Sequence, residues 1–87
     1  GKAAMVGLTR WLATYWAKHQ IRVNALAPAG MFDGHAPQFV RKLSALIPMG
    51  RMAVKNEYQG AILFLVSDAS SFMTGSTLVV DGGRTCW

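Results

Sequence analysis

The residues best suited to chemistry lie at two places, a lysine that opens an apolar helical stretch and a short turn that follows a strand-like segment. Lys2 provides the ammonium group, and Pro28-Ala29-Gly30-Met31 forms the turn. In open α/β sheets, ligands bind beyond the carboxyl ends of the strands. Small residues at such a place allow backbone amides to approach a ligand closely. A turn of this kind also commonly serves only to end a strand. The pattern alone therefore leaves open both a ligand-binding and a purely structural interpretation.

The other reactive side chains form no recognisable set. Cys86 is the single cysteine, and the two histidines, His19 and His35, are far apart in the sequence. The chain has only four acidic residues, none at a metal-ligand spacing, so we expect no metal site. No Ser-His-Asp or nucleophilic cysteine arrangement is present either. For His35, a solvated loop side chain is the simpler expectation, and a role in substrate recognition is the alternative.

Two strands and a long helix are expected to position these residues. Apolar side chains recur every three or four residues across 3–18, which predicts a helix. The apolar run 21–27 predicts a buried strand that ends at Pro28, and residues 76–80 predict a second strand. A long crossover joins the two, which implies a parallel pair.

The crossover itself is expected to contain two helices. Residues 37–47 predict the first one, with Pro37 in its first turn. Residues 57–67 predict the second, and Asn56 with Gln59 resembles a capping box at its start. The sequence therefore predicts an α/β fold in the order helix, strand, helices, strand.

Composition limits the functions that the chain can have. Its 87 residues allow one small domain, yet 52% are apolar, which favours a unit that packs against a larger body or against copies of itself. The net charge of +5 comes from dispersed basic residues, so we expect no nucleic-acid binding. No apolar run is long enough to span a bilayer, and a lone cysteine fits a reducing cytoplasm. We therefore expect no membrane association and a cytoplasmic location.

Four segments in a particular order carry a family resemblance. They are Lys2-Ala3-Ala4 with Leu8-Thr9-Arg10, Ile21-Arg22-Val23-Asn24 through Pro28, Ile47-Pro48-Met49-Gly50-Arg51-Met52, and Phe64-Leu65-Val66-Ser67-Asp68 through Thr74-Gly75 and Val79-Val80-Asp81-Gly82-Gly83. Together they resemble the C-terminal portion of a short-chain dehydrogenase/reductase of the classical type. The resemblance covers essentially all 87 residues.

The resemblance implies an NAD- or NADP-dependent oxidoreductase that transfers a hydride to or from a carbonyl. Lys2 matches the family lysine, which holds the ribose hydroxyls of the cofactor and lowers the pKa of a tyrosine one helical turn earlier. Pro28, Ala29, Gly30 and Met31 match the loop that meets the nicotinamide carboxamide. The loop departs from the family pattern Pro-Gly-x-Val/Ile-x-Thr at Ala29, Met31 and Asp33, and a carboxylate at Asp33 is electrostatically unfavourable near a diphosphate.

The resemblance also implies a partial Rossmann-like fold that lacks the N-terminal nucleotide-binding half. The family's catalytic Tyr and Ser and its glycine-rich phosphate turn have no match here, so we expect residues 1–87 to form a C-terminal fragment that binds no cofactor and is inactive alone. Family interfaces correspond to residues 3–18 and 57–80, which predicts a homo-oligomer, either a dimer or a tetramer. An oligomerisation module, or one half of a split dehydrogenase completed by an N-terminal partner chain, are the alternatives.

Overall fold

The computed structural model describes residues 1–87, which form three α-helices, two β-strands and four short 3-10 helices. The α-helices are α1 (Lys2–Trp16), α2 (Pro37–Ala45) and α3 (Gln59–Val66); the strands are β1 (Ala25–Pro28) and β2 (Thr77–Val80); the 3-10 helices are η1 (Ala17–His19), η2 (Lys55–Glu57), η3 (Asp68–Ser70) and η4 (Arg84–Cys86). The predicted order of helices and strands is therefore confirmed.

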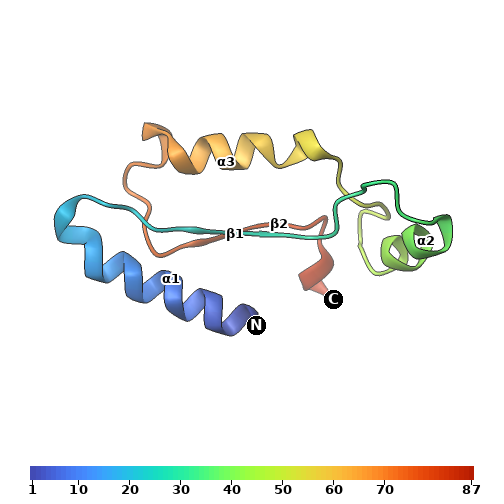
Figure 1. The fold of residues 1–87 in the computed structure, drawn as a ribbon, viewed down its shortest axis with the longest axis horizontal. Helices are drawn as coiled ribbons and strands as arrows, with labels where there is room; N and C mark the ends of the chain where they lie inside the picture. The colour runs from blue at the N-terminus through green and yellow to red at the C-terminus, as the bar shows by residue number, and fades with distance from the viewer.

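The two strands form a parallel pair between two layers of helix. Ala25 pairs with Thr77, and Pro28, the last residue of β1, pairs with Val80. Figure 1 shows α1 along one face of the pair, α3 along the other, and α2 beyond the ends of the strands. The crossover 29–76 contains both α2 and α3, as a parallel connection requires. The predicted fold class, a partial Rossmann-like α/β fold with two parallel strands, is confirmed.

The first strand is shorter than the apolar pattern predicts. The sequence indicates a strand over 21–27, whereas regular pairing begins only at Ala25. Just upstream, the side-chain amide of Asn24 donates to the carbonyl of Met73 (2.9 Å) and its oxygen accepts the N–H of Ser76 (3.0 Å). The side chain of Asn24 thus interrupts the regular backbone ladder, while the N–H of Gly75 still donates to the carbonyl of Val23 at 2.8 Å. The apolar run therefore extends further than the regular strand.

Arg22 fastens the C-terminal end of α3 to the segment that precedes β1. Its guanidinium donates to the carbonyls of Leu65 (3.1 Å), Ser67 (3.2 Å) and Met73 (3.2 Å) and to Oγ of Ser70 (3.0 Å). Carbonyls at a helix C-terminus have no intrahelical partner, and a planar guanidinium can bind several of them at once. This cluster of contacts, the Arg22 clasp, therefore holds one helical layer against the strands.

The start of α3 differs from the prediction. A capping box at Asn56 and Gln59 was expected from the sequence, but Asn56 lies within η2 and Gln59 is the first residue of the α-helix, without a side-chain cap. The carboxylate of Glu57 instead accepts the N–H of Val54 at 3.0 Å. The capping-box prediction is wrong because Glu57, and not a residue after it, turns back to the chain.

Few side chains are buried, and α1 and α3 expose apolar faces. Six of the 87 residues are buried: Thr9, Ala13, Ile47, Met52, Tyr58 and Ser70. The exposed apolar side chains include Met5, Leu8, Trp11 and Tyr15 on α1 and Ile62, Leu63 and Val66 on α3. The radius of gyration is 15.2 Å, compared with about 12 Å for a compact domain of this length. None of the helices has both the length and the apolar character needed to cross a membrane.

Candidate active site

The functional residues predicted from the sequence gather where the two strands end. Because Pro28 pairs with Val80 in a parallel register, the loops after both strands leave the sheet at the same edge. A cavity of about 110 Å³ at this edge is lined by Lys2, Pro28, Ala29, Gly30, Leu43, Ile47, Asp81 and Arg84. We call it the strand-end cavity. It brings Lys2 together with the first three residues of the predicted loop, whereas Met31 does not line it.

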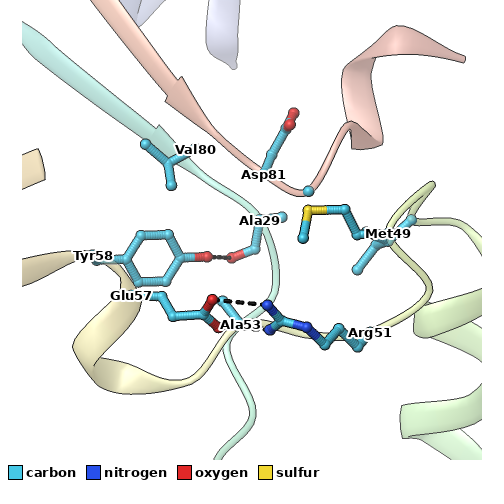
Figure 2. Close-up of a pocket in the computed structure, with 10 residues that line it drawn as sticks. Ala29, Met49, Arg51, Ala53, Glu57, Tyr58, Val80 and Asp81 are labelled. Atoms are coloured by element: carbon cyan, nitrogen blue, oxygen red, sulfur yellow. Dashed lines mark hydrogen bonds and ion pairs between the residues drawn. The ribbon is translucent and has the colours of Figure 1, made fainter.

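Hydrogen bonds with Tyr58 and Ala53 hold the backbone of the loop after β1 in place. The hydroxyl of Tyr58 donates to the carbonyl of Ala29 at 3.1 Å (Figure 2). The N–H of Ala53 donates to the carbonyl of Gly30 (3.2 Å), and the N–H of Phe32 donates to the carbonyl of Ala53 (2.8 Å). These backbone groups are already committed, so a ligand at the loop would have to use others.

Gly30 permits close packing between this loop and α2. A Cβ added at Gly30 would lie 2.5 Å from Cδ2 of Leu43 and 3.3 Å from Cε of Met52. The sequence predicts that the small residues of this loop allow close approach by a ligand; at Gly30 the approaching group is instead the side chain of Leu43. The next residue, Met31, forms an isolated parallel bridge with Ala53, which explains why it turns away from the strand-end cavity.

Asp81, directly after β2, completes the strand-end cavity and was missed by the sequence analysis. Its carboxylate accepts the hydroxyl (2.8 Å) and the N–H (3.1 Å) of Thr85 and the N–H of Gly83 (2.9 Å). The Thr85 hydroxyl above all, together with the two N–H groups and the charge of Lys2, holds the pKa of Asp81 below its ordinary value despite partial desolvation. Its position in the sequence could have identified it as a site residue, because Asp81 directly follows β2 just as the predicted loop directly follows β1.

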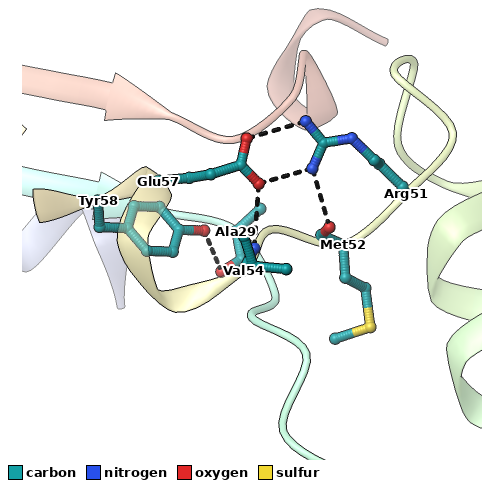
Figure 3. A network of polar contacts seen from close by, with 6 residues as sticks. All are labelled: Ala29, Arg51, Met52, Val54, Glu57 and Tyr58. Atoms are coloured by element: carbon teal, nitrogen blue, oxygen red, sulfur yellow. Dashed lines mark hydrogen bonds and ion pairs between the residues drawn. The ribbon is translucent and has the colours of Figure 1, made fainter. Parts of the chain in front are cut away.

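A second cavity of about 120 Å³ adjoins the first and contains an ion pair (Figures 2 and 3). Nη1 and Nη2 of Arg51 lie 2.6 and 2.8 Å from the two carboxylate oxygens of Glu57. The Arg51 guanidinium, helped by the N–H of Val54, lowers the pKa of Glu57 to about 2. Each charge is satisfied by the other, so this pair stabilises the loop geometry and leaves no free charge for a ligand.

The remaining reactive side chains line neither the strand-end cavity nor the adjoining second cavity. His35 is exposed, accepts the N–H of Asp33 at 3.3 Å, and has its ring 5.1 Å from that of Phe39. Cys86 is a free, exposed thiol. The His, Cys, Asp and Glu side chains include no group of three that could hold a metal ion. The charged side chains that line the strand-end cavity are therefore Lys2, Asp81 and Arg84.

Comparison with known proteins identifies the family. A family model described as enoyl-(acyl carrier protein) reductase matches residues 1–85. The crystal structure of a short-chain type dehydrogenase/reductase from Mycobacterium marinum aligns with a TM-score of 0.89 at 43% identity, covering 99% of this chain and 35% of that one. The chain belongs to the short-chain dehydrogenase/reductase family. The resemblance stated from the sequence motifs is confirmed.

Further relatives show how much of a short-chain dehydrogenase/reductase the chain represents. The ribulose-forming D-arabinitol 2-dehydrogenase of Candida tropicalis is 45% identical over 99% of this chain and 33% of its own length. The 2-dehydro-3-deoxy-D-gluconate 5-dehydrogenase of Dickeya dadantii is 41% identical over 94% and 35%. A short-chain dehydrogenase from Leptospira borgpetersenii with bound NAD+ has a TM-score of 0.89 at 37% identity, over 97% and 33%. The chain spans about a third of these relatives.

The residues of this short-chain dehydrogenase/reductase segment fit one end of a nicotinamide cofactor. The ammonium of Lys2 has three donors suited to ribose hydroxyls, and its side chain is exposed. Pro28 and Ala29 line the same cavity as Lys2. The phosphates of a dinucleotide have no glycine-rich turn within these 87 residues. The fit is therefore to the ribose and nicotinamide end alone.

Proposed function

We propose that the chain is the C-terminal portion of an NAD- or NADP-dependent oxidoreductase that transfers a hydride between the cofactor and a carbonyl or alcohol. One observation carries this proposal. Lys2 and the loop Pro28-Ala29-Gly30 line a single cavity beyond the carboxyl ends of two parallel strands, in a member of a family that includes an NAD+-bound structure. Residues 1–87 would then form one segment of a larger catalytic domain.

In this proposal each site residue has a defined role. Lys2 donates hydrogen bonds to the ribose hydroxyls, and its charge favours the phenolate form of a tyrosine that comes from outside these 87 residues. Pro28, Ala29 and Gly30 form the wall beside the carboxamide, and Met31 lies at its margin because Ala53 holds it. A bound nicotinamide supplies or accepts the hydride. Since the chain spans about a third of its relatives, we propose that it is inactive and binds no cofactor alone.

A chimera tests the oxidoreductase proposal. Residues 1–87 would replace the matching third of the Candida tropicalis D-arabinitol 2-dehydrogenase, to which they are 45% identical. We expect the purified chimera to bind NAD(H) or NADP(H) and to reduce a ketose, and we expect Lys2→Met to abolish the activity. Lys18→Met, an exposed lysine in η1, is the matched control. A folded chimera that binds neither cofactor, or equal losses from both variants, would contradict the proposal.

The isolated chain tests the proposal of inactivity. Fluorescence titration of the 87-residue chain with NADH and NADPH should show no saturable binding at micromolar concentrations, and no turnover should accompany it. Saturable micromolar binding would overturn the inactive interpretation. If adding an N-terminal two-thirds fragment of a relative restored turnover, the split-enzyme alternative with an N-terminal partner chain would be favoured.

A second candidate function, assembly, rests on the exposed apolar faces. On α1, Trp11 and Tyr15 are each 59% exposed and their rings stack at 5.2 Å, and on α3 Val66 is 73% exposed. We propose that residues 3–18 and 57–80 form interfaces of a homo-oligomer, either a dimer or a tetramer. Covering a few hundred Å² of such surface contributes several kcal/mol at ~25 cal/mol per Å², from which the cost of association is subtracted. Light scattering that shows a stable monomer at high concentration would defeat this proposal.

A further inference from the structure

We propose that Arg84 binds a carboxylate of the substrate at the strand-end cavity, so that the whole enzyme acts on a hydroxy acid or the matching oxo acid. The proposal rests on the proposed function and names the substrate class of the same site. In the oxidation, the hydroxyl carbon of the acid loses a hydride to the bound nicotinamide. Its hydroxyl oxygen loses a proton to the tyrosine that comes from outside these 87 residues. The carboxylate is unchanged, so Arg84 acts by binding and orienting the substrate.

Cations are in excess where the two strands end. The charged side chains that line the strand-end cavity are the cations Lys2 and Arg84 and the carboxylate of Asp81. Figure 1 shows the start of α1 and the C-terminal end of the chain on the same side of the strands. The Asp81 oxygens already accept three hydrogen bonds from Gly83 and Thr85, between 2.8 and 3.1 Å. The one ion pair in the structure lies elsewhere, so both cations are available to an anion.

Arg84 differs from the arginines that hold the fold together. The guanidinium of Arg22 donates to four acceptors in the Arg22 clasp, and that of Arg51 binds both carboxylate oxygens of Glu57. The side chain of Arg84 lines a cavity, is exposed and belongs to no ion pair. A planar guanidinium presents two parallel N–H groups that match the two oxygens of a carboxylate. A ligand carboxylate can therefore take the place that Glu57 has beside Arg51.

The backbone around Arg84 is fixed at the end of β2. Its N–H donates to the carbonyl of Asp81 at 3.1 Å, and the next residue, Thr85, is bonded to the carboxylate of Asp81 through its N–H and its hydroxyl. The preceding Gly83 has a φ of +92°, and a Cβ there would lie 2.9 Å from Cγ of Pro48. Only the side chain of Arg84 then has to be ordered by a ligand, which limits the entropy lost on binding.

The position of the cavity favours a substrate carboxylate over a phosphate of the cofactor. Pro28, Ala29 and Gly30 line it together with Arg84, and in the proposed function this loop forms the wall beside the carboxamide. A substrate must lie next to the nicotinamide for hydride transfer. Lys2 is engaged by the ribose in that function, so Arg84 is the cation left for the substrate. The volume of about 110 Å³ is several times what one water molecule requires, which leaves room for a carboxylate.

The first test is an NMR titration of the 87-residue chain, without cofactor, with D-arabinonate and with D-arabinitol. These probes differ only by a carboxylate in place of one terminal alcohol. We expect D-arabinonate to give saturable amide shifts at Arg84 and Thr85, and D-arabinitol to give none. Arg84→Gln should abolish the shift at Thr85, whereas Arg41→Gln, an exposed arginine of α2, should leave it unchanged. No saturable shift with D-arabinonate, equal shifts with both probes, or equal effects of the two variants would overturn the proposal.

The second test measures substrate preference in the chimera described above. Arg84→Gln should lower the ratio of kcat/KM for D-arabinonate to kcat/KM for D-arabinitol by about tenfold, the effect of one charge-assisted hydrogen bond. It should leave the Kd for the nicotinamide cofactor unchanged, and Arg41→Gln should change neither quantity.

The outcomes of the second test separate the possible anions. If Arg84→Gln raises the Kd for the cofactor and spares the ratio, the anion is a cofactor phosphate and the substrate proposal is overturned. A chimera that oxidises D-arabinitol but not D-arabinonate would overturn it as well. A chimera that binds no cofactor would count against the proposed function alone, because the titration of the isolated chain does not depend on cofactor.

Discussion

The hydroxyl of Tyr58, at the base of α3, donates a hydrogen bond of 3.1 Å to the carbonyl of Ala29 in the loop that follows β1. Tyr58 is only 8% exposed, so neither its ring nor its hydroxyl is freely solvated. Polar groups removed from water need partners, and these two groups satisfy each other. The helix that returns the chain to β2 is thereby tied to a wall of the candidate site.

Removal of the Tyr58 hydroxyl should destabilise the chain without a change in packing. Tyr58→Phe leaves the carbonyl of Ala29 without its donor, and we expect a loss of about 1 kcal/mol in the free energy of unfolding. Urea denaturation followed by circular dichroism measures this loss. Tyr15→Phe is the control, because that tyrosine is 59% exposed and packs only through its ring. Equal stabilities for the two variants would contradict the assigned role.

Two glycine-to-alanine changes should have opposite effects. Gly30→Ala places a methyl group 2.5 Å from Cδ2 of Leu43, and overpacking of this kind costs about 1–3 kcal/mol. Gly7→Ala, in the middle of α1, meets nothing within 4 Å and should stabilise the helix by about 1 kcal/mol. The Leu43→Ala change should make Gly30→Ala nearly neutral. If the effects of Gly30→Ala and Leu43→Ala on the free energy of unfolding are simply additive, the contact between these two residues is not the cause of the destabilisation.

The order of the elements and the position of the loop could be predicted from sequence because both depend on local signals. Apolar spacing of three or four residues identifies α1, and Pro28 marks the end of a strand, since proline cannot donate to a ladder. The length of β1 could not be predicted in this way. An apolar run records burial, whereas regular strand pairing begins only after Asn24, whose side chain interrupts the backbone ladder.

The contacts that hold the site together were missed because they connect distant parts of the chain. The Arg22 clasp joins residues more than 40 positions apart in the sequence, and nothing near Arg22 signals its acceptors. Asp81 and Lys2 lie near opposite ends of the sequence and line the same cavity because the parallel strands end at one edge of the sheet. The capping box failed for a different reason, since Asn56 lies inside η2 and the carboxylate of Glu57, and not Gln59, accepts the N–H of Val54.

The Arg22 clasp predicts a local and measurable loss of protection. Arg22→Lys keeps the charge, but an ammonium cannot reach four acceptors that are arranged around a planar fork. We expect a loss of about 2 kcal/mol, typical of charge-assisted hydrogen bonds. Amide hydrogen exchange should accelerate at Ser70 and Met73, whose N–H groups bond within the same turn. Arg41→Lys, on the exposed side of α2, should change nothing, and uniform acceleration across the chain would argue against a local clasp.

The Arg51–Glu57 pair predicts a defined pH dependence. The pKa of Glu57 is lowered from 4.5 to about 2, first by the Arg51 guanidinium and then by the N–H of Val54. A carboxyl group whose pKa is lowered by folding contributes its full stabilisation at any pH above its ordinary pKa of 4.5. This stabilisation is lost as the pH falls from 4.5 towards 2. Arg51→Met should raise the pKa of Glu57, as followed by NMR of the carboxyl carbon. Lys55→Met is the control, and an identical shift in both variants would contradict the specific pairing.

The exposed faces of α1 and α3 predict how the chain assembles. Trp11→Glu and Leu63→Glu change side chains that are 59% and 65% exposed, so neither substitution should unfold a single chain. Each should remove one apolar interface, because a buried carboxylate without a partner is strongly unfavourable. If α1 and α3 act as separate interfaces, light scattering will show a lower mass for each variant and a monomer for the double variant. Lys42→Glu, an exposed residue of α2 outside both interface ranges, controls for added negative charge. A mass that all three substitutions leave unchanged would mean that assembly, if it occurs, uses neither face.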